Sequence, residues 1–239
     1  MPQKLPCTVM EVIDHGGQVY SVLLKPASTA PRFQPGQFLH LALDPYSPGD
    51  FWPDSRSFSI ASSPLERNLL RLTYAVKGQF TRRMEAELQP GLAVWVKLPH
   101  GEFMVNVHSD VCLVAGGTGI TAFSAFLSAM APAPAGNSPE VHLFYGARQP
   151  DLLIYRPQIE AARLRCPNLH VHYWAEEYTA GTDCLPGRLS VESIWSAAVP
   201  VPQRLSYYLA GPPAMLQAFR QGLLERGVPA GRVFIDDWN

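Results

Sequence analysis

The sequence has no long apolar run. None of its stretches approaches the ~18 consecutive apolar residues that a helix needs to cross a bilayer, so no membrane span is expected. Residues 1–6 lack the apolar core of a signal peptide. Together these absences predict a cytoplasmic protein.

The sequence also lacks an excess of charge. Lys and Arg total 19 and Asp and Glu total 20, which excludes the basic footprint of a nucleic-acid-binding protein or a polybasic membrane anchor. Cysteine is scarce, and Cys7, Cys112, Cys166 and Cys184 form no C-x-x-C pair. Neither a bound metal nor an iron–sulfur cluster is expected, and the four residues are predicted to be reduced thiols.

A hydrophobic content of 47% over 239 residues indicates a folded core in one large domain or two smaller ones. The first hundred residues are short β-type runs separated by Gly, Pro and Asp, with one helical pattern over 80–88, which predicts an antiparallel barrel or sandwich. The expected strands are 7–13, 19–24, 38–43, 57–60, 69–76 and 93–98.

Beyond about residue 105 strand and helix patterns alternate, which predicts a parallel sheet covered by helices, with ligands bound at the carboxyl ends of its strands. The boundary near 99–110 gives two predicted domains, 1–104 and 105–239. The expected strands are 112–115, 141–145, 169–174, 206–209 and 233–235, and the expected helices are 121–130, 151–165, 191–197 and 214–226.

The most informative segment is the glycine loop Gly116-Gly117-Thr118-Gly119. It follows a buried-strand pattern and precedes a helical one. Glycines allow close approach of a ligand to the backbone, and the N–H groups that begin a helix favour an anion such as a pyrophosphate. An ordinary tight strand-to-helix turn is the alternative.

A second segment surrounds Arg56. Strand alternation predicts that Arg56, Phe58 and Ile60 share one face, with the hydroxyls of Ser57 and Ser59 beside them. A guanidinium forks onto phosphate, an aromatic ring stacks on a heterocycle, and a hydroxyl donates to a ring nitrogen. The combination suits a flavin nucleotide, and a partly buried strand with an exposed arginine is the alternative.

A third segment ends a strand at Tyr74–Val76 and starts a helix after Gly78. The helix N-terminus and the Thr81 hydroxyl could bind phosphate, although a plain capped helix has the same pattern.

These three segments, together with three further motifs, occur in an order that resembles the ferredoxin–NADP⁺ reductase superfamily over essentially the whole chain. In sequence order they are Pro35-Gly-Gln-Phe38, Arg56-x-Phe-Ser59, Gly78-x-x-Thr81, Gly116–Thr121, Tyr145–Arg148 and Ala210–Met215.

The resemblance implies a six-stranded flavin-binding barrel followed by a nucleotide-binding α/β domain. It further implies an NAD(P)H-dependent flavin oxidoreductase, in which a hydride passes from NAD(P)H to flavin N5. By this resemblance Phe58 lies against the flavin ring and Ser59 near N5, so these two are the implied catalytic residues. The other implied flavin ligands are Arg56, Ser57, Tyr74, Val76, Gly78 and Thr81.

The resemblance also implies a pyridine-nucleotide site in the second domain. Its residues would cradle the dinucleotide or border the nicotinamide. They are Gly116, Gly117, Thr118, Gly119, Thr121, Arg148, Glu176, Gly211, Pro212 and Met215. Many relatives have cysteine where this chain has Ala210, a difference that would alter the rate rather than abolish the reaction.

The identity of the cofactors is less fixed. Arg148 could take a 2′-phosphate, but Glu176 and Glu177 would repel it and could accept from a ribose hydroxyl, so NADH is favoured over NADPH. Solvated loop acids are the alternative. FAD is favoured over FMN, because FAD is the usual cofactor of the superfamily and Gly78-x-x-Thr81 fits a pyrophosphate. FMN-using relatives often carry an attached ferredoxin-like domain, which is not expected in this sequence. In some relatives a C-terminal aromatic residue covers the flavin. Trp238 could do so, with packing beyond the last strand as the preferred alternative.

The expected partners are NAD(P)H and a separate electron acceptor, namely a ferredoxin, an oxygenase component, a haem protein or a small acceptor. A non-catalytic or regulatory electron-transfer subunit of a larger complex is the second hypothesis. Hydride transfer requires no general acid or base, so the histidines are assigned no catalytic role. They are His15, His40, His100, His108, His142, His170 and His172.

Overall fold

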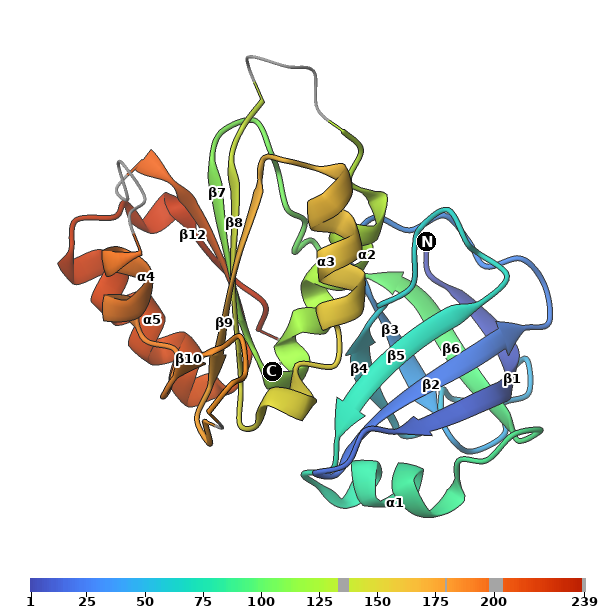
Figure 1. Cartoon of the computed structure of the whole chain (residues 1–239). Helices are drawn as coiled ribbons and strands as arrows, with labels where there is room; N and C mark the ends of the chain where they lie inside the picture. The colour runs from blue at the N-terminus through green and yellow to red at the C-terminus, as the bar shows by residue number, and fades with distance from the viewer. Residues whose placement is uncertain (133–137, 179, 198–203, 238–239) are drawn as a thin grey trace. The chain divides into compact units, whose positions relative to one another are not determined.

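The computed structural model describes residues 1–132, 138–178, 180–197 and 204–237. The chain divides into two compact units (Figure 1). The first contains Met1–Met104 and Thr121–Ala129, and the second contains Val105–Ile120 and Met130–Asn239. Each unit is described by itself below.

The first unit is built on a six-stranded antiparallel sheet with the order β4-β3-β6-β1-β2-β5. The sheet is strongly curved, as the sequence pattern predicted (Figure 1). A bulge between Val9 and Glu11 shifts the register of β1 with β2, just beyond the residues of β1 that pair with β6. The strands are β1 Gln3–Asp14, β2 Val19–Pro26, β3 Phe38–Ala42, β4 Ser55–Ser59, β5 Leu70–Ala75 and β6 Ala93–His100.

Alternating apolar residues fill the interior of this sheet. Leu39 and Leu41 of β3 and Val94 and Val96 of β6 are fully buried in one cluster. Helix α1 (Gln79–Glu87) adds Phe80 and Met84 to the same cluster. The unit also contains α2 (Thr121–Ala129), where the buried Ser124 hydroxyl donates to the carbonyl of Ala61 at 2.6 Å.

The second unit is a six-stranded parallel sheet with the order β10-β9-β8-β7-β11-β12. Helix α3 lies on one face and α4 and α5 on the other (Figure 1). Its strands are β7 Val111–Gly116, β8 Val141–Ala147, β9 Leu169–Ala175, β10 Leu185–Pro186, β11 Ser206–Ala210 and β12 Val233–Ile235. Its helices are η1 Gly117–Ile120, η2 Pro150–Leu152, α3 Arg156–Arg165, α4 Val191–Ser196, α5 Pro213–Glu225 and η4 Ala230–Arg232.

The predicted fold class is confirmed, with two local differences. The helix expected over 151–165 is a short 3₁₀ turn followed by α3, because Pro157 fits only the first turn of an α-helix, which therefore begins at Arg156. The second difference is β10, which is not among the expected strands because its two residues are too few for a sequence pattern. No helix in the described part of the chain is long and apolar enough to cross a membrane.

Candidate functional site

The first unit brings Arg56 next to the N-terminus of α1. The guanidinium carbon of Arg56 lies 5.2 Å from the centre of the Phe80 ring, in the first turn of that helix. A guanidinium and the free N–H groups of a helix start both favour an anion. Two segments that are 22 residues apart in sequence at Arg56 and Gly78 therefore combine into one candidate phosphate site.

The start of α1 leaves room beside its backbone. Gly78 is the N-cap residue, and a Cβ atom built on it would meet nothing within 4 Å. The Thr81 hydroxyl accepts from the backbone N–H groups of Lys77 and Gly78 at 2.9 and 3.0 Å and donates to the Gly78 carbonyl. The hydroxyl thus caps the helix, while the space beside Gly78 stays accessible.

Arg56 already has an anionic partner. Its Nη1 lies 2.6 Å from Oδ1 of Asp54 and donates to the Ser55 carbonyl at 2.7 Å. Both charged side chains are more than half exposed, so this pair contributes little to stability. A bound phosphate would compete with Asp54 for the guanidinium.

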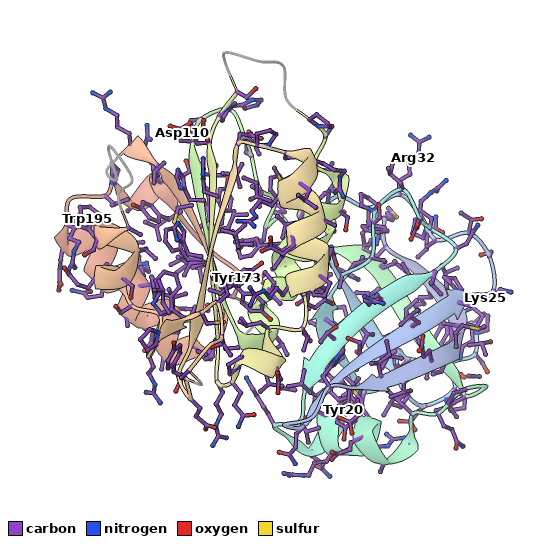
Figure 2. The ribbon with its side chains drawn as sticks, viewed as in Figure 1. Tyr20, Lys25, Arg32, Asp110, Tyr173 and Trp195 are labelled. Carbon is purple, nitrogen blue, oxygen red and sulfur yellow. The ribbon has the colours of Figure 1, made fainter. Side chains whose placement is uncertain are left out.

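Aromatic side chains gather around Tyr74 in the same unit. The Phe58 ring meets Tyr74 edge-on at 6.2 Å between ring centres, and Tyr20 stacks on Tyr74 at 5.6 Å. Tyr20 lies beside α1, where its hydroxyl donates to Glu85 (Figure 2). The Tyr74 hydroxyl is buried and has no hydrogen-bond partner among the described residues, and burial raises its pKa. A buried hydroxyl without a partner fits a site that takes a polar ligand or water.

The strand register separates the predicted flavin residues into two groups. Arg56 and Phe58 pair with Leu41 and Leu39, whereas Ser57 and Ser59 pair with His40 and Phe38 and point to the other face. Ser59 is 8% exposed, and Ile60 is buried in the core. Val76, partly buried, packs against that core and donates its N–H to the Gln18 carbonyl. Arg56, Phe58 and Tyr74 therefore form one group, and the two serines do not join it.

In the second unit the glycine loop packs against the end of β11. A Cβ atom on Gly119 would collide with the Ala210 carbonyl, and one on Gly116 would lie 2.6 Å from Sδ of Met215. Gly211, at φ +155°, is also covered by the Met215 methyl group. The carboxyl ends of β7 and β11 thus bring together Gly116, Gly119, Gly211 and Met215, where a parallel sheet binds ligands.

The other predicted residues of this loop differ in exposure. Gly117 has φ +54° and faces open space. Thr118 is half-buried, and Thr121 is 5% exposed at the start of α2. Pro212 is exposed and is the N-cap residue of α5. Gly117 is therefore the glycine of this loop that has open space beside its backbone.

Arg148 and the two glutamates meet at the carboxyl ends of β8 and β9. Arg148 Nε lies 2.6 Å from one oxygen of Glu177, and Gln149 Nε2 donates to the other at 2.6 Å. The Gln149 hydrogen bond and the Arg148 charge lower the pKa of Glu177. Glu176 pairs instead with Arg188 at 2.9 Å. Gln149 and Arg188 are not among the predicted site residues. The pairing of β9 with β10, which places Arg188, has no periodic signal in the sequence.

The described residues hold no cluster of three or more His, Cys, Asp or Glu that could bind a metal. All four cysteines are free thiols. Trp238 lies outside the described residues.

Similarity to known proteins agrees with this geometry. Residues 113–221 match the family model of the oxidoreductase NAD-binding domain. The chain is 27% identical to the anthranilate 1,2-dioxygenase electron transfer component of Acinetobacter baylyi, over 82% of this chain and 55% of the relative. It is 29% identical to the propane 2-monooxygenase reductase component of Rhodococcus jostii, over 91% and 59%. The chain spans little more than half the length of these relatives.

Solved structures show the same fold. The ferredoxin reductase in carbazole 1,9a-dioxygenase superposes with a TM-score of 0.79 at 23% identity, over 100% of this chain and 70% of that one. The ferredoxin NADP⁺ reductase from Neisseria gonorrhoeae, with bound FAD and NADP, gives 0.78 at 17% identity over 99% of both chains. The chain has the fold of these reductases, and the resemblance to the ferredoxin–NADP⁺ reductase superfamily is confirmed. Residues 113–221, which lie partly in each unit, are similar to the oxidoreductase NAD-binding domain.

Proposed function

We propose that this protein is an NAD(P)H-dependent FAD oxidoreductase that passes electrons to a separate acceptor. One observation carries the proposal: each unit has its own candidate anion-binding site. In the barrel it is Arg56 with the N-terminus of α1, and in the parallel sheet it is the loop Gly116–Gly119. Residues 1–104 would bind FAD and residues 105–239 would bind the nicotinamide nucleotide.

The residues present fit a flavin nucleotide. Arg56 and the open N-terminus of α1 would hold the phosphates, Phe58 would pack on the ring system, and the buried Tyr74 hydroxyl would find a polar partner there. Ser59 lies on the other face of β4, so its contact with the flavin stays a prediction. When bound, FAD supplies two-electron acceptance and one-electron release, which no side chain of this chain can provide.

We propose NADH as the preferred donor. Arg148, the cation available to a 2′-phosphate, lies 2.6 Å from an oxygen of Glu177, so a phosphate would have to compete with that carboxylate. Glu176 presents a second carboxylate, oriented by Arg188, that would repel a phosphate and could accept from a ribose hydroxyl. Exchanging Glu176 for Arg should raise the NADPH/NADH ratio of kcat/KM. An unchanged ratio would remove Glu176 from the ribose site.

The acceptor belongs to the same proposal. The similar proteins from Acinetobacter baylyi and Rhodococcus jostii are named as electron transfer and reductase components of oxygenases. By analogy, the acceptor of this chain would be an oxygenase component or a ferredoxin. The described residues provide no metal cluster of their own, so any one-electron carrier must lie elsewhere.

A visible absorption spectrum tests the proposal. The purified protein, loaded with FAD, should show oxidised flavin bands that bleach on anaerobic addition of NADH. Bands that persist with both NADH and NADPH would favour the second hypothesis, a subunit that works only within a larger complex. If neither FAD nor FMN binds, the proposed function is wrong.

A further inference from the structure

A cavity lies in the second unit, beside α3 and the outer edge of the parallel sheet. Its volume is about 300 Å³, at the lower end of the range for small-molecule sites. Helix α3, strand β9 and the segment that leads into β10 form its walls. None of the lining residues is among the predicted flavin or nucleotide ligands. They are Glu160, Arg163, Val171, His172, Tyr173, Thr182, Asp183, Cys184 and Leu185.

One wall of the cavity is an open strand edge. Strand β10 pairs with β9 at Trp174 and Ala175, and no described strand pairs with residues 169–173 on this side. The Ala175 carbonyl accepts from the Gly187 N–H, so it faces away from β8. Backbone groups alternate in direction along a strand, and those of Val171 therefore face the same way. Val171, which lines the cavity, thus has an outward N–H and carbonyl that a strand-like ligand would satisfy.

Two ion pairs set the charges around the cavity. Arg163 lies 2.8 Å from Glu160 on the same helix. The Tyr173 side chain points from β9 towards α3, where its hydroxyl donates to Glu160 at 2.8 Å (Figure 2). Arg156 lies 2.9 Å from Asp183 and stacks on the Tyr173 ring at 4.7 Å. Glu160 and Arg156 are thus each held by two contacts within the protein.

Arg163 and Asp183 are the accessible members of these pairs. Their side chains are 54% and 96% exposed, whereas those of Glu160 and Arg156 are 30% and 32% exposed. A guanidinium has five N–H donors, so Arg163 has donors for a further anion besides its described contact. Among the described contacts, Asp183 accepts through Oδ2 alone. The cavity therefore offers a cation to a carboxylate and a carboxylate to an ammonium group.

The spacing of these two groups selects the length of the ligand. Asp183 lies beside Arg156 in the first turn of α3, and Arg163 is seven residues further along the helix. A helical rise of 1.5 Å per residue separates these points by roughly 10 Å. An extended peptide spans about 3.3–3.6 Å per residue, so the charged ends of a peptide of about three residues match this separation. A single amino acid is too short to reach both groups.

We propose that this cavity binds a free peptide of about three residues, extended antiparallel to the outer edge of β9. Its carboxylate would pair with Arg163, which is close to the start of β9 because only residues 166–168 separate α3 from that strand. Its ammonium group would pair with Asp183, and its backbone would bond to Val171 as an added strand bonds to a sheet edge. The half-buried Cys184 lies on the cavity wall, where a bound peptide would cover its thiol.

Protection of Cys184 from alkylation tests the inference without relying on turnover. Cys7, Cys112 and Cys166 are buried, so iodoacetamide should modify Cys184 first. Mass spectrometry of the full FAD-loaded chain measures the rate of this modification with and without the probe, trialanine. Saturating trialanine should slow the modification about tenfold, because the thiol loses access to the reagent. Calorimetry measures the dissociation constant of the same peptide.

Two variants and two matched controls locate the contacts. Arg163→Gln and Asp183→Asn each remove one charged hydrogen bond, so each should weaken trialanine binding about tenfold. Arg165→Gln and Asp151→Asn remove exposed charges outside the cavity and should bind as the original protein does. The affected ion pairs are surface pairs, so the thermal midpoint should change little in all four variants. Equal affinity of the two cavity variants and the original protein for trialanine would overturn the inference.

Modified peptides test the ligand with the protein unchanged. N-acetyl trialanine lacks the ammonium group, trialanine amide lacks the carboxylate, and trialanine methylated on its central amide nitrogen lacks a backbone donor. Each should bind about tenfold more weakly than trialanine. If the acetylated peptide binds as tightly as trialanine, the cavity takes the C-terminus of a longer chain and the free-peptide assignment is wrong. If the methylated peptide binds as tightly, the pairing with the strand edge is wrong.

Nucleotide competition separates the cavity from the proposed cofactor sites. NADH should change neither the modification rate of Cys184 nor the affinity for trialanine. If NADH protects Cys184 or displaces trialanine, the cavity belongs to the nucleotide site and the inference is overturned, while the reductase stands. If trialanine binds as described and NADH fails to bleach the flavin, the peptide site stands and the proposed activity is wrong.

Discussion

The two units build their candidate anion-binding sites in different ways. In the first, an arginine side chain and a helix start meet beside Gly78, and nothing in the protein occupies the space that a Cβ atom would take there. In the second, a side chain on Gly119 would collide with the Ala210 backbone, and one on Gly116 would have to displace the end of the Met215 side chain. A glycine in such a motif can therefore be needed because the protein packs tightly around it or because a ligand approaches its backbone. The structure distinguishes these two cases.

The largest effect is expected from Gly119→Ala. The added methyl group meets the Ala210 backbone, which cannot move aside as a flexible side chain could, so we expect a loss of about 1–3 kcal/mol in the free energy of unfolding. Nicotinamide nucleotide binding should be lost while FAD remains bound. Thermal unfolding and flavin fluorescence measure both.

Gly78→Ala is the matched variant in the first unit. Its backbone has φ −127°, which any residue adopts, and its Cβ atom enters open space, so stability should change little. FAD affinity should fall, because the methyl group takes room beside the helix start. If both alanine variants lose stability equally, the contrast between the two glycines is wrong.

Arg56→Ala should weaken FAD binding by about 1.5–3 kcal/mol, the value of a hydrogen bond to a charged group, which is roughly ten- to a hundredfold in the dissociation constant. Arg56→Lys keeps the charge but not the fork and should recover part of the loss. Fluorescence titration of the apoprotein with FAD measures the three affinities. Equal affinities of the original protein and the two variants for FAD would show that the first unit, like the second, binds its anion through backbone groups.

Helices and strands were predictable from the sequence where a single hydrophobic periodicity ran through the segment. The alternation in β3 and β6 and the apolar run of β7 identified the strands, and the motif order indicated both units. Pairings between distant segments were not predictable: the contact of Arg56 with Phe80 depends on how β4 and α1 pack, and that of Arg148 with Glu177 on adjacent strand ends. The open edge of β9 depends on the register of β10, which single-strand patterns do not reveal.

The pH dependence of stability should also differ between the units. Burial lowers the pKa of His15, His40 and His100 in the first unit and of His142 and His172 in the second. Because their folded pKa values lie below the unfolded value of about 6.5, the unfolded chain binds more protons at mildly acidic pH. The contribution of these histidines to the free energy of unfolding is fully present above about pH 6.5. It is lost as the pH falls through their pKa values in the folded protein.

Chemical denaturation between pH 7.5 and 5 measures this loss. Each excess proton bound by the unfolded chain steepens the fall by up to about 1.4 kcal/mol per pH unit. Replacing His40 and His100 together with glutamine should flatten the profile more than replacing His142 and His172. Lys97 adds to burial in lowering the pKa of both residues in the first pair. His170 does the same in the second pair, but the carboxylates of Glu140 and Asp110 raise the pKa of His142. Equal flattening by the two double variants would show that the charges around the two pairs have the same net effect.

The smallest effect is expected from Asp54→Asn. Asp54 holds the Arg56 guanidinium at 2.6 Å, so an incoming phosphate must displace a carboxylate before it can bind. An exposed ion pair contributes about 0–1 kcal/mol, which limits the gain in FAD affinity to roughly fivefold. Asp50→Asn removes another exposed carboxylate, which forms no ion pair with Arg56, and serves as the control for net charge. Tighter FAD binding in Asp54→Asn alone would show that a side chain competes with the ligand for the anion site of the first unit. The backbone loop of the second unit has no such competing side chain among the described contacts. Equal gains in both variants would reduce the effect to a general change in charge.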